Sequence, residues 1–202
     1  MRQLARACLV LALLVRSTVC AVATDLSGIN PYVTIRVYND VQLSEKVLAE
    51  AEQEAVRIFH QAGVNTIWIE CQSSRVGSDM DSRCQYPPGL THLALRIVPR
   101  AWSAGDSIFG VAFLSAEGNG AYGDVFYDSV EKLHREWRAS VPRVLGHVMA
   151  HEIGHLLLGL HSHSRLGIMC PSWHGEQLRS IGMGTLFFMP EQARSIRTRL
   201  SP

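Results

Sequence analysis

Alternating apolar and polar positions mark the first elements of the chain. In PYVTIRVYN (31–39), β-branched and aromatic residues recur at alternate positions, which predicts a strand. Beyond Ser44, a residue type favoured at helix N-caps, apolar residues recur at helical spacing as far as Phe59, and Gly63 then closes the pattern. A strand followed by an amphipathic helix is therefore expected.

Further apolar segments are typical of strands. NTIWIEC (65–71) and HLALRIVP (92–99) are two of them, and a polar, glycine-containing loop separates them. The glycine-rich segment 105–129 holds two short apolar runs, FGVAFL and YGDVFYD, which predict paired edge strands joined by a loop. This order of strands and helix predicts a mixed sheet backed by a helix.

The second half of the chain has a mainly helical pattern. VEKLHREW (130–137) begins with helical spacing, and the apolar stretch around Pro142 runs without a breaker to Gly159. MPEQARSIRTRL (189–200) predicts a C-terminal helix with Pro190 in its first turn. We expect one α+β domain in which a mixed, twisted sheet packs on two helices and the C-terminal helix lies behind them.

The N-terminus has the pattern of a secretory signal peptide. Basic residues precede an apolar run (7–15) that is too short to span a membrane as a helix, and a small-residue cleavage site ends at Ala23. We expect residues 1–23 to be removed, which leaves 24–202 as a single domain. The protein would then be secreted or periplasmic.

Composition limits the class of protein and its partners. The chain has 202 residues, of which 47% are hydrophobic and 18% charged, as expected for a globular domain with a core. The formal net charge is +1 and the basic residues are scattered, so the chain carries no electrostatic footprint for nucleic acid or an anionic membrane. We expect a monomer that binds neither nucleic acid nor, stably, a membrane.

Export changes the interpretation of the cysteines. Cys71 and Cys84 flank the polar loop between two predicted strands, and in an oxidising compartment they predict a disulfide that clamps this loop. Cys170 is then unpaired, and we expect it to be a buried thiol that behaves as a small hydrophobic residue.

The segment HEIGHLLLGLHSHSRLGIM (151–169) concentrates metal-binding side chains. His151 and His155 are four residues apart on the predicted helix, so both rings project from one face and can converge on one ion. Glu152 is rotated by about 100° around the helix, from where a general base can still reach a water molecule at the metal. Zinc suits this set because neutral imidazoles hold a borderline-soft, redox-silent ion, and the site then needs one more protein ligand and an open position.

The surrounding sequence favours a metal site over two packed polar residues. Glu152 lies within a strongly apolar helix, where a buried and unpaired charge costs several kcal/mol. Six of the nine histidines fall between His147 and His174. His147 lies one turn before His151 on the same face; a hydrogen-bonded core histidine is the favoured interpretation, and a role beside the metal site is the alternative.

The succession of HEIGH, a glycine, further histidines and a methionine resembles the metzincin metalloproteases, in particular their matrixin-like branch. The family pattern is H-E-x-x-H-x-x-G-x-x-H, followed by a tight turn that contains methionine. The resemblance implies that His151 and His155 are zinc ligands, that Glu152 is the general base and that Met169 is the turn methionine. More loosely, the chain is similar to uncharacterised secreted bacterial proteins that carry HE-x-GHLLLG, HS-x-x-GIM and a cysteine pair after the second strand.

The chain departs from the metzincin pattern before the third histidine. Leu158 stands where the family has glycine, and Gly159 comes one position later. His161 keeps the family spacing from His155, whereas His163 matches the HS-x-x-GIM element of the bacterial proteins. One more helical residue rotates the helix exit by about 100° and calls for a longer return loop, which favours His163 as third ligand and leaves His161 as the alternative.

These features together predict a secreted zinc metalloendopeptidase acting on an extended peptide or protein substrate. The segment from Gly110 to Leu114 would pair with the substrate backbone; ordinary hairpin structure is the alternative there. Two other functions stay open, namely a secreted zinc-binding module without catalysis and a zinc amidohydrolase with a non-peptide substrate. Because a structural zinc site holds four protein ligands, binding by both His161 and His163 would favour the module.

Overall fold

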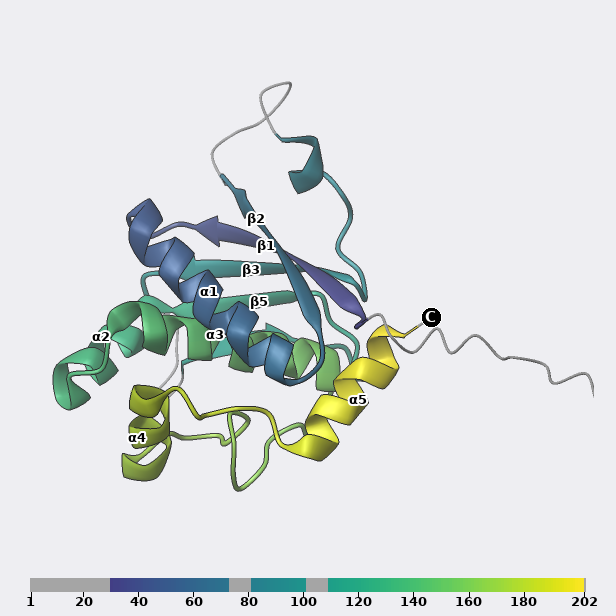
Figure 1. Cartoon of the computed structure of the whole chain (residues 1–202). Coiled ribbons are helices and arrows are strands. Elements are labelled where there is room, and N and C mark those ends of the chain that lie inside the picture. Colours follow the sequence, from purple (N-terminus) through teal and green to yellow (C-terminus); the bar gives the residue numbers. More distant parts are fainter. Residues whose placement is uncertain (1–29, 73–80, 101–108, 202) are drawn as a thin grey trace, which may run out of the picture.

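A five-stranded mixed sheet organises the part of the chain that the computed structural model describes, residues 30–72, 81–100 and 109–201 (Figure 1). The strand order is β2-β1-β3-β5-β4, and every neighbouring pair is parallel except β4 with β5. The mixed sheet expected from the sequence is therefore confirmed. The strands are β1 (Tyr32–Asn39), β2 (Asn65–Cys71), β3 (His92–Val98), β4 (Gly110–Phe113) and β5 (Tyr122–Phe126).

Helices account for most of the second half. Those predicted around 45–63, 142–159 and 189–200 are present, whereas the one predicted from residue 130 already begins at Tyr127. The helix α4 was not predicted, because its nine residues are too few to show a clear apolar period. The helical elements are α1 (Glu45–Gln61), the 3₁₀ turn η1 (Ser82–Cys84), α2 (Tyr127–Trp137), α3 (Val141–Leu158), α4 (Gly175–Met183) and α5 (Pro190–Leu200).

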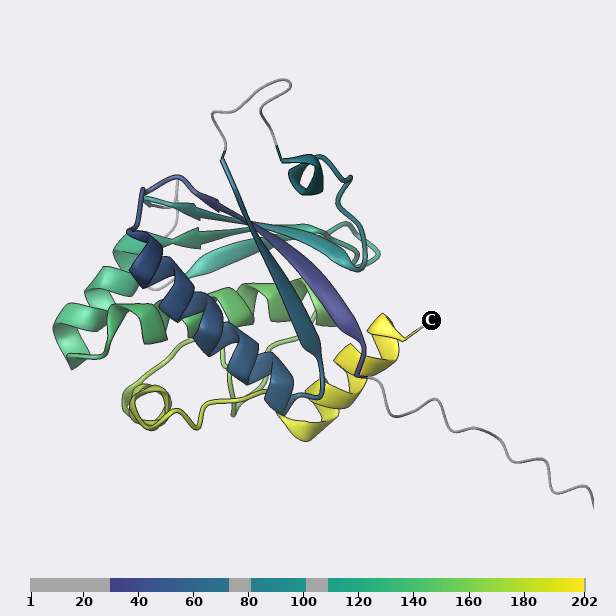
Figure 2. The same cartoon turned by 45° about the horizontal axis from the view of Figure 1, so that its top comes forward.

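The core lies between the sheet and the two helices α1 and α3, which cover the same face (Figure 2). Alternate residues of β1, Val33, Ile35 and Val37, point into this core and are fully buried. The two helices approach closely at Gly146 of α3, where an added Cβ would lie 2.5 Å from the carbonyl oxygen of Ala51. Helix α3 is consequently buried along most of its length, together with its polar side chains.

The opposite face of the sheet, which we call the open face, is covered only in part. Cys71 and Cys84 form a disulfide, as predicted, and with Ile69 they make a small buried cluster on this face. Arg36 is also buried there, and its guanidinium donates hydrogen bonds to the carbonyl oxygens of Cys84 and Tyr86. The disulfide loop is therefore fastened to the sheet by both a covalent bond and a buried cation.

Two expectations from the sequence need correction. β5 is not an edge strand, because it lies between β3 and β4; its run of buried residues, including Val125 and Phe126, is typical of an interior strand. Cys170 is a free thiol but only half-buried, and its Sγ lies 3.2 Å from the carbonyl oxygen of Ser172.

The predicted signal peptide, residues 1–23, lies outside the described residues. Within the described parts of the chain, no helix is both long and apolar enough to cross a membrane.

Candidate metal centre

The buried helix α3 brings two imidazoles together. His151 and His155 are one turn apart, and their Nε2 atoms lie 3.0 Å from each other. His151 is 4% exposed, so its ring nitrogens depend on partners inside the protein. The helical spacing read from the sequence therefore produces the expected convergence.

The outer nitrogen of each ring is occupied by a hydrogen-bond partner. Nδ1 of His151 lies 2.7 Å from the carbonyl oxygen of Ile168, which can only accept, so this nitrogen carries the proton. Nδ1 of His155 lies 2.6 Å from the hydroxyl of Ser162. The proton on Nδ1 of His151 leaves its Nε2 free to bind a metal, and Nε2 of His155 faces it, the arrangement found in metal-bound histidines.

His163 completes the group. Its ligand atom and those of His151 and His155 all lie within 4.8 Å of one another. The chain reverses direction after α3 through Gly159, which has a φ of +81°, and through His161, which also adopts a left-handed conformation. His161 is exposed on this turn and does not belong to the three-histidine group. Of the two alternatives, the structure thus brings only His163 to the pair.

The loop that carries His163 is held from helix α5. The side chain of Gln192, which is 8% exposed, donates hydrogen bonds to the carbonyl oxygen of Ser162 at 3.2 Å and to the hydroxyl of Ser164 at 3.0 Å. Its Oε1 accepts from the backbone N–H of Met189 at the start of α5. One amide therefore fixes the residues on both sides of His163.

Apolar side chains pack against the turn of α3 that carries the two histidines. Met169 is fully buried, and an added Cβ at Gly154 would lie 2.6 Å from its sulfur, so the thioether packs on the helix between the two histidine turns. The indole N–H of Trp173 donates to the same Ile168 carbonyl that holds His151, at 3.2 Å. This carbonyl, and with it the ring of His151, is restrained from two sides.

Glu152 lies beneath the edge strand β4. It is 3% exposed, and an added Cβ at Gly110 would lie 2.7 Å from its carboxyl carbon, so only glycine fits at that position of the strand. Burial raises the pKa of Glu152 to about 8 in the metal-free protein. A nearby divalent cation would favour the ionised form of this carboxyl group.

The electrostatics of the imidazoles suit metal binding. Burial lowers the pKa of His151 to about 4 and, together with the neighbouring rings, that of His155 to about 3. Burial also lowers the pKa of His163. Because a metal binds the neutral ring, these ligands need not lose a proton at neutral pH before they bind an ion.

His147 belongs to the core, as expected. It is fully buried, and its Nδ1 lies 2.8 Å from the carbonyl oxygen of Arg143 and 3.5 Å from Glu54. Burial lowers its pKa to about 4. His147 is not part of the three-histidine group.

Comparisons with known proteins show a likeness of fold, whereas no protein-family model and no curated protein sequence matches the chain. Metalloproteinase-II from Bacteroides fragilis is similar with a TM-score of 0.53 and 12% identity over 84% of this chain and 53% of its own, so the chain spans about half of that protein. The zinc-dependent peptidase from Methanocorpusculum labreanum has a TM-score of 0.51 and 16% identity, over 80% and 99% of the two chains. Archaemetzincin from Methanopyrus kandleri has a TM-score of 0.49 and 16% identity, over 84% and 96%.

The fold is shared with zinc-dependent peptidases. In this fold the three-histidine group is able to hold a divalent ion and is consistent with Zn²⁺. Two imidazoles bound to zinc at about 2.0–2.1 Å in tetrahedral geometry have their nitrogens roughly 3.3 Å apart, close to the separation of 3.0 Å between His151 and His155. Three imidazole donors, two of which have their outer nitrogens already hydrogen-bonded, fit a zinc ion.

Sequence reasoning missed two residues of this site. Ser162 stands between His161 and His163, so its place near the ligands could have been suspected, although its hydrogen bond to His155 could not. Gln192 is about 30 residues from the loop it holds, and no local pattern marks it. Only the docking of α5 against the loop brings the two together.

Proposed function

We propose that this protein is a secreted zinc metallopeptidase that hydrolyses peptide bonds. The observation that carries the proposal is the group of His151, His155 and His163, with Glu152 next to His151 in α3, on a fold shared with zinc peptidases. Among the described residues, three protein ligands rather than four leave one coordination position open, as catalytic zinc sites do. This argues against the alternative of a purely structural zinc module, since His161 lies outside the group.

Each residue has a defined role in the proposed reaction. His151, His155 and His163 hold the ion, which when bound acidifies water and polarises a carbonyl group. The carboxylate of Glu152 accepts a proton from the attacking water and transfers it to the leaving amine. Burial between α3 and β4 keeps this carboxylate in place and away from bulk water.

Strand β4 offers the substrate a backbone to pair with. The hydrogen bond from the Phe126 N–H to the Phe109 carbonyl oxygen fixes which backbone groups of β4 point toward β5. By the alternation of an antiparallel pair, the N–H and C=O groups of Gly110 and Ala112 then point to the free edge of the sheet. An extended peptide can add there as a further strand, above the carboxylate of Glu152.

The finer assignment follows the metzincin resemblance. We infer a metzincin-like endopeptidase in which Met169 is the turn methionine beneath the ion, and the buried contact of its sulfur with α3 at Gly154 supports this. We further infer that the mature protein begins near Thr24, acts outside the cytoplasm as a monomer and takes a polypeptide substrate. The disulfide between Cys71 and Cys84 supports export, because disulfides persist in oxidising compartments.

Replacing Glu152 with alanine tests the proposal. The variant should keep its zinc, because the three imidazoles are unchanged, while peptide hydrolysis falls by at least about 100-fold because the general base is lost. Zinc content by atomic emission and turnover of a casein-derived peptide mixture are the two measurements. Undiminished turnover would refute the role of Glu152, and a zinc-loaded wild type that cleaves no peptide would refute the peptidase function.

A further inference from the structure

Within the described parts of the chain, β4 pairs with β5 alone, and its surface is unusual for an edge strand. Its sequence, GVAF, carries no charge, and the side chains of Val111 and Phe113 are 36% and 53% exposed. Edge strands are commonly protected from pairing with other chains by charged residues, proline or bulges. Apolar side chains on an uncharged edge therefore indicate that a partner strand binds at this edge.

The two faces of β4 have separate neighbours. Gly110 faces α3 and the carboxyl group of Glu152, whereas Val111 lies opposite Asp124 and Phe113 opposite Tyr122 on the open face of the sheet. In a sheet, residues directly opposite each other on neighbouring strands share a face. An added strand would thus direct alternate side chains toward the metal site and the others toward Val111 and Phe113.

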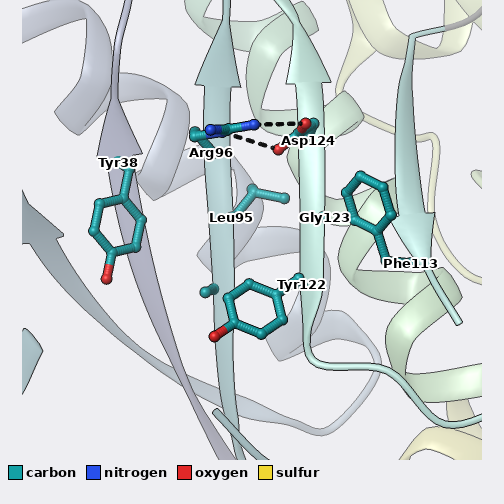
Figure 3. Close-up of a pocket in the computed structure, with 8 residues that line it drawn as sticks. Tyr38, Leu95, Arg96, Phe113, Tyr122, Gly123 and Asp124 are labelled. Atoms are coloured by element: carbon teal, nitrogen blue, oxygen red, sulfur yellow. Dashed lines mark hydrogen bonds and ion pairs between the residues drawn. The ribbon is translucent and has the colours of Figure 1, made fainter. Parts of the chain in front are cut away.

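The open face beside β4 is hollowed into a groove of about 520 Å³. Figure 3 shows the rings of Tyr38, Tyr122 and Phe113 around this groove, with Arg96 and Asp124 at one end. The guanidinium of Arg96 makes two hydrogen bonds to the Asp124 carboxylate, at 3.2 and 3.1 Å. Because the two charges neutralise each other, the groove presents aromatic surface rather than a net charge to a ligand.

We propose that the open face of β4 selects the substrate: a polypeptide with apolar or aromatic side chains at two positions, two residues apart, that face Val111 and Phe113. The chemical class is an extended, apolar-patterned peptide, paired with β4 so that its remaining side chains face the metal site. This inference rests on the proposed peptidase function. It adds a specificity-determining surface on the face of the sheet opposite to the metal.

Cleavage profiling of a mixed peptide library by mass spectrometry tests the inference, with wild type compared with Val111→Ser and Phe113→Ser. We expect apolar or aromatic enrichment at two positions, two residues apart, in the wild-type profile, and loss of one position in each variant. For a peptide that matches the wild-type profile, kcat/KM should fall by roughly two- to fivefold per variant, the worth of one cross-strand apolar pair. Phe113→Leu should retain most of the preference.

Ile67→Ser is the matched control. Ile67 is 49% exposed on the same open face but on β2, at the other edge of the sheet, so its replacement removes similar apolar surface away from β4. Zinc content and unfolding temperature should be equal in all variants. Equal profiles for wild type, Val111→Ser and Phe113→Ser would overturn the inference while the peptidase function stands.

Two other outcomes are distinguishable. Zinc-loaded wild type that cleaves no peptide would remove the proposed function and this inference with it, and that failure appears in the wild type rather than in the variants. A dimer in sedimentation that Phe113→Ser dissociates, with an unchanged cleavage profile, would also overturn the inference, because it would assign β4 to pairing between two copies of the chain.

Discussion

At the scale of single residues, orientation separates the metal-binding histidines from the others. His151 and His155 each give one ring nitrogen to a partner in the protein and direct the other to the shared space. His147, one turn earlier on the same helix, also has a partner at Nδ1, yet it packs against α1 and Trp173 rather than joining the group. Spacing on the helix is thus necessary for the site, but the direction of each ring is decided by neighbours outside the helix.

Alanine substitutions distinguish the two candidate third ligands. We expect His163→Ala to lose most of its bound zinc after dialysis, because two imidazoles remain, whereas His161→Ala should keep a full equivalent because the exposed His161 ring lies outside the group. Metal content of the two variants beside wild type is the measurement. Full zinc retention in His163→Ala together with loss in His161→Ala would reverse the assignment.

At the scale of elements, the packing of α1 against α3 sets the position of the site. The two helices touch where Gly146 meets the backbone of Ala51, and a larger residue would push α3 away from α1. The same helix carries the metal-site residues at 151–155, so its distance from β4 also sets how Glu152 lies under the substrate edge. The absence of a side chain at Gly146 therefore allows the close contact of α1 and α3 that positions the site.

Gly146→Ala tests this packing. The added methyl group would lie 2.5 Å from the Ala51 carbonyl oxygen, so the helices must shift, and we expect the free energy of unfolding to fall by about 1–3 kcal/mol. Gly182→Ala in α4 is the control: no atom lies within 4 Å of its added Cβ, and alanine is the better helix former by roughly 1 kcal/mol. Equal stabilities of both variants by urea denaturation would contradict the packing argument.

At the scale of the whole molecule, the sheet separates two surfaces with different tasks. The face under α1 and α3 holds the core and the three histidines, while the open face holds the disulfide loop and the aromatic groove. The edge strand β4 contributes to both, through Gly110 on one side and Phe113 on the other. Buried titratable groups gathered in the first region make the stability of the metal-free protein depend on pH.

We expect the metal-free protein to be most stable near pH 6.5. The pKa of His147 and of His151 is lowered from 6.5 to about 4 and that of His155 to about 3, so below pH 6.5 the unfolded chain takes up protons that the folded chain does not, and acidification favours unfolding. The pKa of Glu52 is raised from 4.5 to about 7 and that of Glu152 to about 8, so the folded chain keeps protons that the unfolded chain loses, and raising the pH toward 8 also favours unfolding.

Thermal unfolding in EDTA between pH 5 and pH 8 measures this dependence. Between pH 4.5 and 6.5 the three imidazoles outweigh the two carboxyl groups, and above pH 6.5 the carboxyl groups dominate. The control is Glu152→Gln, which cannot ionise and should flatten the alkaline fall. An unfolding temperature that still rises from pH 6.5 to pH 8 would contradict the burial of Glu152 as a protonated group.

The sequence by itself determined the features that depend on near neighbours in the chain. Helical periodicity placed His151, Glu152 and His155 on one buried helix, alternation marked the strands, and spacing around a polar loop identified the disulfide of Cys71 with Cys84. Each of these follows from the repeat of a helix or strand, or from a short loop. Each therefore depends only on residues that are close together in the sequence.

Only the tertiary structure decided which histidine approaches the pair, that β5 lies inside the sheet, and that Gln192 holds the ligand loop. The path of the loop after Gly159 depends on where α5 docks, and the order of strands depends on which surfaces bury the most apolar area together. Both are set by contacts between segments far apart in the chain, for which a local pattern of residues carries no signal.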